Sequence, residues 1–248
     1  MSRAAVDDAT CRILDWDSAF FGRRIARIES KTLDEARLEA VRELADRESI
    51  DCLYLLLDAA DVGSRRAAEA GGFRPVDVRV TLERASGREE RRDPAIDAYR
   101  ATDLPVLRAL ARASHGDSRF YHDPGFPRER CDALYDAWIS KACRETPDRV
   151  LVARREGQPV GYLACDLDTS EVGSIGLVAV AEEARGHGLG AKLVTAALGW
   201  IGAHGRARTR VVTQERNVAA ARLYERMGFV TTRVEHWYHL WPRAEASS

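Results

Sequence analysis

The 248-residue sequence has little lysine and almost no net charge. Only Lys31, Lys141 and Lys192 occur among 38 basic residues, and the formal net charge is −1 at pH 7. A balanced charge gives no electrostatic reason to bind nucleic acid or a membrane surface, so neither is expected as a partner. No apolar run approaches the ~20 residues of a membrane span, and the first residues lack an apolar signal core. These absences favour a cytoplasmic protein.

Cysteine and histidine are also sparse, and their spacing does not indicate a metal site. Five cysteines are scattered, odd in number and without Cys-x-x-Cys spacing, which favours reduced structural thiols. The six histidines do not pair at metal-ligand spacing, and His236 and His239 fall in an aromatic, strand-like segment. We therefore expect no metal. The cysteines are Cys11, Cys52, Cys131, Cys143 and Cys165.

The glycine-rich segment 184–193, ARGHGLGAKL, follows an apolar run at 175–180 and leads into a helical pattern. A strand, a glycine-rich turn and a helix start together predict an anion site. A P-loop is a poor match, because Lys192 follows Ala191 and no hydroxyl comes after it. A dinucleotide-binding fingerprint has a different glycine spacing and an acidic residue downstream, where this chain is basic. A plain tight turn before a helix is the other alternative.

Two motifs in this half of the chain carry a family resemblance. Arg185, Gly188 and Gly190 fill the pattern Arg-x-x-Gly-x-Gly, which resembles the pyrophosphate loop of the GNAT acyltransferase superfamily. Downstream, Asn217 and Tyr224 lie about two helical turns apart, on one face of a predicted helix. In the family, an Asn and a Tyr at this spacing flank the thioester. A core tyrosine with a satisfied hydroxyl is the alternative for Tyr224.

The resemblance implies an acetyl-CoA-dependent enzyme that transfers the acetyl group directly to an amine. It implies Tyr224 as general acid and Asn217 as a positioning residue. It also implies an oxyanion held by the backbone N–H of Val178, next to a strand bulge at Gly176. The general base is left open between Glu171, Asp166, Asp168 and an ordered water. The residues implied to bind the coenzyme are Leu177, Val178, Val180, Arg185, Gly186, His187, Gly188, Leu189, Gly190, Ala191, Asn217 and Tyr224.

The order of predicted elements indicates an α/β fold with a mixed sheet. We predict a partial GNAT-like α/β domain at 1–84, a charged linker at 85–94 and a GNAT catalytic domain at 95–248. In the first part, 13–28 is predicted as strand with a turn near Gly22. Gly72-Phe73 and Gly228-Phe229 lie 156 positions apart (228 − 72), and strand and helix patterns recur at that offset. The first part is therefore interpreted as a degenerate copy that helps to form the acceptor site; an unrelated small α/β cap is the alternative.

The N-terminal segment Leu14–Gly22, LDWDSAFFG, indicates the acceptor. It resembles the bacterial TDP-fucosamine acetyltransferase family, which implies a nucleotide-linked 4-amino-4,6-dideoxyhexose as acceptor. Other amines (a peptide, a polyamine or an aminoglycoside) and a non-catalytic acyl-CoA sensor are the alternatives. The sugar, the nucleotide and the acyl chain length are not fixed, and pairing of the C-terminal strand leaves a homodimer open. The candidate acceptor-binding residues are Trp16, Phe21, Arg119, Phe120 and Tyr121.

Overall fold

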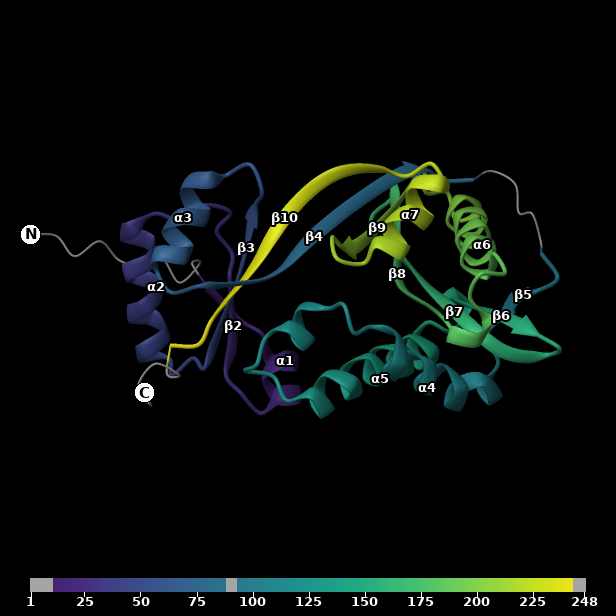
Figure 1. Cartoon of the computed structure of the whole chain (residues 1–248), viewed down its shortest axis with the longest axis horizontal. Helices are drawn as coiled ribbons and strands as arrows, with labels where there is room; N and C mark the ends of the chain where they lie inside the picture. The colour runs from purple at the N-terminus through teal and green to yellow at the C-terminus, as the bar shows by residue number, and fades with distance from the viewer. Residues whose placement is uncertain (1–10, 88–92, 243–248) are drawn as a thin grey trace, which may run out of the picture. The chain divides into compact units, whose positions relative to one another are not determined.

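The computed structural model describes residues 11–87 and 93–242, which form two compact units that interleave along the chain (Figure 1). The first unit comprises Met1–Arg79, Ser118–Pro127 and Val234–Ser248, and the second comprises Val80–Asp117 and Arg128–Arg233. Half of the predicted linker, residues 88–92, lies outside the described residues. The domain boundaries placed at 85 and 94 stay a prediction.

The first unit is a sheet with strand order β1-β2-β3-β10-β4, in which β3 runs parallel to β2 and antiparallel to β10. Helices α2 and α3 cover one face, where Leu38 and Val41 pack against Leu53, Leu55 and other apolar side chains. Its elements are β1 (Cys11–Ile13), α1 (Asp15–Phe21), β2 (Ile25–Ile28), α2 (Glu35–Arg47), β3 (Cys52–Asp58), α3 (Val62–Ala70), η3 (Arg119–His122) and most of β10 (Val230–Leu240), with the start of β4 (Arg74–Ala85).

The second unit has its own core, in which α6 packs against β6, β7 and β8. Its strand order is β10-β4-β9-β8-β7-β6-β5. Its elements are β5 (Ile96–Ala98), η2 (Ala101–Asp103), α4 (Leu104–Ser114), α5 (Arg128–Glu145), η4 (Pro147–Arg149), β6 (Val150–Arg155), β7 (Gln158–Leu167), β8 (Val172–Val180), η5 (Glu182–Ala184), α6 (Leu189–Ala203), β9 (Arg208–Gln214) and α7 (Val218–Arg226), with the end of β4 and the start of β10.

One predicted element is wrong. Residues 15–21 form helix α1, not part of a strand, and Gly22 ends the helix with a left-handed φ of 64°. Aromatic residues favour strands, which suggested the wrong structure. The helix is instead stabilised by Asp15 and Asp17 in its first turn and by Trp16 stacked on Phe20 one turn later, with ring centroids 5.0 Å apart.

The predicted internal repeat is present in the structure. Strand β3 and strand β9 begin 156 positions apart (208 − 52), and the same offset relates α3 to α7 (218 − 62). Asp61 caps α3 by accepting a hydrogen bond from Ser64 N, and Asn217 caps α7 by accepting one from Ala220 N, each at 3.0 Å. Two copies of a strand–helix–strand motif therefore occupy this chain. That the first part is a degenerate copy of the catalytic domain stays a prediction.

The two copies exchange their last strands. In the first unit, β10 of the second copy lies between β3 and β4; in the second unit, β4 of the first copy lies between β9 and β10. Arg79 on β4 forms an ion pair with Glu235 on β10 at 3.0 Å, and Arg210 on β9 forms one with Glu83 on β4 at 2.7 Å. Each unit thus contains a strand from the other copy.

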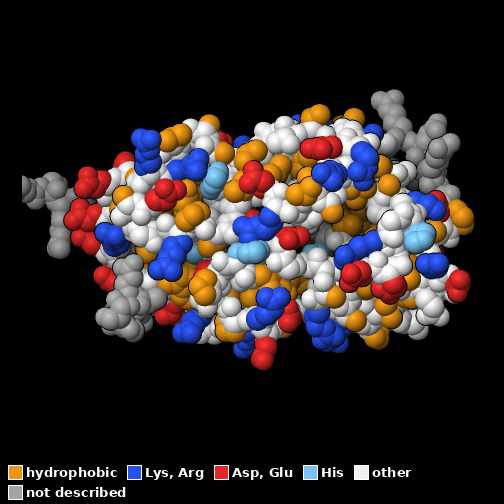
Figure 2. Space-filling model, in the orientation of Figure 1, with side chains coloured by type: hydrophobic (Ala, Val, Ile, Leu, Met, Phe, Trp, Pro, Cys, Tyr) orange, Lys and Arg blue, Asp and Glu red, His pale blue; other side chains and the backbone are white. Residues whose placement is uncertain are grey.

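The charge on the face displayed in Figure 2 and the state of the cysteines match the predictions of a balanced charge and of reduced thiols. Figure 2 shows acidic and basic side chains mixed over the displayed face, without a broad area of one charge. All five cysteines are free thiols. Within 11–87 and 93–242, no helix has the length and apolar character that crossing a membrane requires.

Candidate functional site

Strand β8 separates from its parallel neighbour halfway along. It pairs with β9 from Val172 to Ile175, and the register with β7 shifts between Ile175 and Leu177, which leaves Gly176 as an extra residue. The bulge predicted at Gly176 is therefore confirmed. A Cβ at Gly176 would contact Asp166 and Ala164 at 3.6 and 3.8 Å, so the bulge does not depend on the missing side chain.

Beyond this bulge, the backbone offers hydrogen-bond donors to a ligand. The N–H of Ala181 donates to Val160 O of β7 at 2.8 Å. Because N–H directions alternate along an antiparallel ladder, those of Val178 and Val180 point away from β7, toward the β9 side. The β8–β9 pairing has ended at Ile175. These amides therefore have no strand partner on the β9 side, and binding of an oxyanion by the Val178 N–H stays a prediction.

The glycine-rich loop leads directly into helix α6. Gly186 and Gly188 have φ values of 81° and 74°, which L side chains rarely adopt, and Gly188 is the N-cap. No side chain caps the helix, so the amides of its first turn are available to an anion. Arg185 donates through Nε to Val180 O at 3.1 Å, which ties the loop to the end of β8. His187, Leu189, Gly190 and Ala191 lie in the same loop and first turn.

Asn217 and Tyr224 lie on helix α7 as predicted, at its N-cap and two turns later. The carboxamide oxygen of Asn217 accepts from Ala220 N, which fixes the start of the helix. Tyr224 is 4% exposed, and its ring packs edge-on against Phe229, with centroids 5.6 Å apart. Its hydroxyl has no hydrogen-bond partner among the described residues. Burial raises the pKa of Tyr224, which favours the protonated phenol.

The three carboxylates considered for the general base each have a basic or polar neighbour. Asp166 lies 3.4 Å from Arg149, and burial raises the pKa of Asp166. Asp168 accepts a hydrogen bond from Ser174 at 2.8 Å, and Glu171 lies 3.6 Å from Arg208. None of these contacts selects one carboxylate, so the general base stays open.

The candidate acceptor residues all belong to the first unit, but they differ in exposure. Trp16 is 44% exposed, and Tyr121 is half-buried. Phe21 and Phe120 are buried and stacked on each other, with centroids 5.4 Å apart, so their rings pack the unit. Arg119 places its guanidinium over Phe120, at 4.2 Å from the ring centroid.

Three further residues surround Arg119 and were missed in the sequence. Its guanidinium carbon lies 4.3 Å from the ring centroid of Trp237 and 5.1 Å from that of Tyr54. Arg27 approaches the Trp237 ring at 5.3 Å. Strand periodicity placed Arg27, Tyr54 and Trp237 on strands, but only the pairing of β2 with β3 and of β3 with β10 brings them together.

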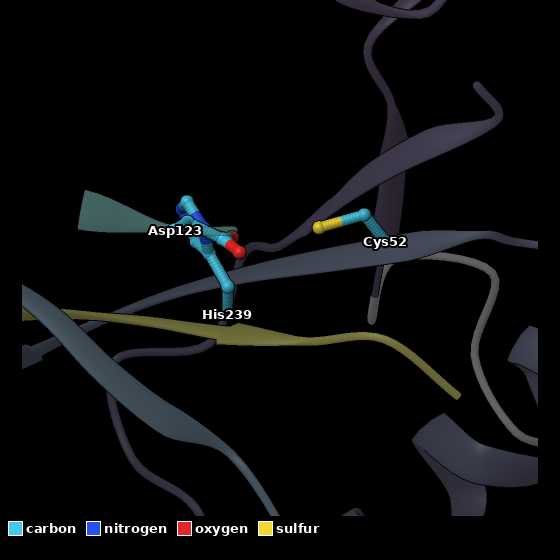
Figure 3. Close-up of side chains that lie close together, drawn as sticks. All are labelled: Cys52, Asp123 and His239. Atoms are coloured by element: carbon cyan, nitrogen blue, oxygen red, sulfur yellow. The ribbon is translucent and has the colours of Figure 1, made fainter. Parts of the chain in front are cut away.

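Cys52, Asp123 and His239 form a buried cluster in the same unit (Figure 3). His239 Nδ1 lies 2.6 Å from an Asp123 oxygen, and Asp123 also accepts from Gly125 N and Trp241 Nε1. Two ligands of one tetrahedral zinc lie roughly 3.3 Å apart, so 2.6 Å fits a hydrogen bond and not shared coordination. Burial raises the pKa of the Cys52 thiol, which disfavours the thiolate that a metal needs. The cluster therefore fits a structural role.

Comparisons with known proteins agree with this geometry. Residues 111–229 match the acetyltransferase (GNAT) family. The chain is 31% identical to a dTDP-fucosamine acetyltransferase of Escherichia coli, over 93% of this chain and 98% of the relative. It is 29% identical to a spore coat polysaccharide biosynthesis protein of Bacillus subtilis, over 58% of this chain and half of that protein. A GCN5-related N-acetyltransferase of Sphaerobacter thermophilus has a similar fold, with a TM-score of 0.65 and 17% identity over 94% of this chain and 76% of that one. The chain therefore belongs to the GNAT acetyltransferase family and is an acyltransferase.

Proposed function

We propose that this N-acetyltransferase transfers the acetyl group of acetyl-CoA to the amine of a nucleotide-linked amino sugar of the TDP-4-amino-4,6-dideoxyhexose type. The observation that carries the proposal is the match to the dTDP-fucosamine acetyltransferase of Escherichia coli, which spans nearly the whole of both chains. A match confined to the coenzyme-binding residues would have identified the donor alone. Here the similarity includes the first unit, where the candidate acceptor residues lie.

Three features of the second unit support acetyl-CoA as the donor. The uncapped start of α6 and the left-handed Gly188 offer amides to the diphosphate of the coenzyme. The amides of β8 beyond Gly176 offer hydrogen bonds to the pantetheine arm. Arg185 adds a cation beside this loop. Together these features offer binding groups to both the diphosphate and the extended pantetheine arm of coenzyme A.

In the proposed reaction, the neutral amine of the sugar attacks the thioester carbonyl carbon, forming a C–N bond. The Val178 N–H stabilises the oxyanion, and the C–S bond then breaks. Tyr224 donates its proton to the departing sulfur and recovers one from solvent, while the proton lost by the amine leaves to a base or water. Asn217 acts as a positioning residue through the start of α7. The transfer is direct, without an acyl-enzyme, and burial raises the pKa of Cys11, Cys52, Cys143 and Cys165, which disfavours their nucleophilic thiolates.

The test is an acceptor panel in which thiol release from acetyl-CoA is followed. dTDP-4-amino-4,6-dideoxyhexoses, polyamines, an aminoglycoside and peptides with free N-termini are supplied at equal concentrations. We expect turnover with the sugar nucleotides and at most slow reaction with the others. Faster turnover of a polyamine or peptide would refute the acceptor assignment. Tight acetyl-CoA binding without turnover of any amine would favour the acyl-CoA sensor.

A further inference from the structure

One face of the first unit's sheet carries charged and aromatic side chains where the other carries an apolar core. Arg27, Tyr54 and His239 are register partners across β2, β3 and β10, so their side chains emerge on the same face. Trp237 and Glu235 follow on that face of β10 at two-residue steps. The opposite face bears the apolar residues under α2 and α3. The charged face is therefore not needed for that core.

Two arginines on this face lack the partners that buried arginines normally have. Arg27 and Arg119 lie against the Trp237 ring at 5.3 and 4.3 Å, and neither forms an ion pair with any residue in 11–87 or 93–242. The Nε atoms of both are buried without a hydrogen-bond partner, and so is the Tyr54 hydroxyl. A buried donor without an acceptor destabilises the folded protein. A hydrogen-bond acceptor would satisfy all three groups; the Nε2 atom of His239 on the same face is also buried without a partner.

A third arginine adds to the positive charge. Arg79 is half-buried and pairs with Glu235 at 3.0 Å. Burial lowers the pKa of Arg79; Glu235 opposes this shift, while the charges of Arg27 and Arg119 add to it. Arg79 thus lies close enough to Arg27 and Arg119 to feel their charge, while Glu235 is its ion-pair partner. Asp17 interacts with Arg119, and burial raises the pKa of Asp17; Asp123 and Asp77 are further buried acids of this unit. An anion with several oxygens would provide hydrogen-bond acceptors for the three guanidinium groups.

We propose that Arg27, Arg79 and Arg119, arranged around Trp237 and Tyr54, bind the diphosphate of the nucleotide-linked acceptor. Guanidinium groups suit phosphate oxygens because they donate in a planar fork, and stacking on an aromatic ring holds that fork in orientation. This inference rests on the proposed function for the identity of the ligand. It adds to the proposed function the residues that recognise the charged phosphates of the acceptor, in contrast to its sugar and amine.

The test measures binding by calorimetry without acetyl-CoA, using dTDP, inorganic pyrophosphate and thymidine as probes. Arg27→Gln and Arg119→Gln are compared with Arg66→Gln. Arg66 is an exposed residue of α3, on the other side of the sheet, so this variant removes the same charge away from the proposed site. Arg119→Lys keeps the charge but not the fork. Circular dichroism checks that each variant is folded.

We expect Arg27→Gln and Arg119→Gln each to weaken dTDP and pyrophosphate binding about tenfold or more. Arg119→Lys should fall between wild type and Arg119→Gln, Arg66→Gln should change binding less than twofold, and thymidine should bind far more weakly than dTDP. Undiminished dTDP binding by folded Arg27→Gln and Arg119→Gln proteins, or no binding of either phosphate by wild type, would overturn the inference.

The acceptor panel separates this inference from the proposed function. If the amino sugar is acetylated and its KM is unchanged in Arg27→Gln, the function stands and the phosphate site is wrong. If Arg27→Gln loses dTDP binding but no amino sugar is acetylated, the phosphate site stands and the acceptor assignment is wrong. In the expected case, the acceptor KM rises about tenfold while the acetyl-CoA KM stays within twofold.

Discussion

Tyr224 combines a buried ring with a hydroxyl that no described residue holds. If the phenol protonates the leaving sulfur, Tyr224→Phe should lower kcat by about 10²–10⁴-fold, which is roughly 3–5 kcal/mol of transition-state stabilisation. Acetyl-CoA affinity should change little, because the ring and its packing remain. Steady-state kinetics and calorimetry measure the two effects separately.

A suitable control for this variant is Tyr162→Phe. Tyr162 is a buried tyrosine of the same unit whose hydroxyl contacts His115 Nε2 at 3.1 Å. It tests the effect of removing a buried phenolic hydroxyl without removing the proposed acid. An unchanged kcat in Tyr224→Phe, or an equal loss in both variants, would contradict the acid role.

His239 predicts how stability depends on pH. The imidazole is 1% exposed, and burial lowers its pKa to about 4, against the opposing hydrogen bond of Asp123. Between pH 6.5 and pH 4 the unfolded chain therefore binds more protons at this residue than the folded one, and the free energy of unfolding falls as pH falls. The stabilisation is fully present above pH 6.5, and its loss reaches about 3 kcal/mol at pH 4.

The measurement is the Tm of wild type and His239→Gln between pH 7.5 and pH 5. Glutamine keeps a hydrogen-bonding group near Asp123 but does not titrate in this range. We expect a lower Tm for the variant at pH 7.5 and a smaller decrease on acidification. His115, whose pKa burial also lowers to about 4, contributes the same trend in both proteins and is removed by the comparison. Parallel Tm curves would show that His239 does not contribute.

Two substitutions at the start of helix α6 separate the effect of a negative charge from the effect of side-chain size. Gly188→Asp places a carboxylate at an N-cap that lacks a side-chain cap, and Gly188→Asn places a neutral group of the same size there. Both residues tolerate a left-handed φ better than most, and both can cap the helix. The aspartate would compete with an anionic ligand for the same amides.

We expect coenzyme A to bind at least tenfold more weakly to Gly188→Asp than to Gly188→Asn, with similar Tm values. Calorimetry and thermal melts provide the comparison. Equal affinities for the two variants would mean that the amides at the start of α6 do not bind the phosphates.

Elements with a local sequence signal were predicted from the sequence, whereas helix α1, whose packing depends on distant contacts, was not. The glycine loop and α7 carry their own signals, since Gly188 needs a left-handed φ and Asn217 is a preferred N-cap. Helix α1 was missed because its aromatic residues resemble those of a strand, and its packing depends on Phe120 and Phe126 from a loop about 100 positions later. Local pattern alone does not contain that information.

The two candidate sites differ in the same way. The coenzyme residues lie close together in sequence, in the segment after β8 and on the next helix, so a motif can identify them. Arg27, Tyr54 and Trp237 come from three strands, and their proximity follows from strand register. Of this arginine–aromatic cluster, the sequence indicated Arg119, through its position in an aromatic loop.

The exchange of β4 and β10 predicts how the chain behaves when it is divided. A fragment that ends at residue 87 lacks β10, and a fragment that begins at residue 95 lacks β4, so each unit would lose a strand from within its sheet. We expect both fragments to be unfolded or aggregated alone, as judged by circular dichroism and gel filtration. Coexpression should restore a folded complex with acetyltransferase activity. A stable, monomeric 95–248 fragment with native-like coenzyme affinity would contradict this prediction.

The long stretch of sequence between β3 and β10 also determines when the sheet of the first unit can be completed. His239 pairs with Tyr54 at a separation of 185 positions in sequence (239 − 54), and β3 has no antiparallel neighbour until that stretch has been synthesised. During synthesis, β3 therefore keeps one edge unpaired until the residues up to β10 have emerged from the ribosome. Such late pairing makes nascent chains prone to edge-to-edge association, so chaperone binding should raise the yield of native protein.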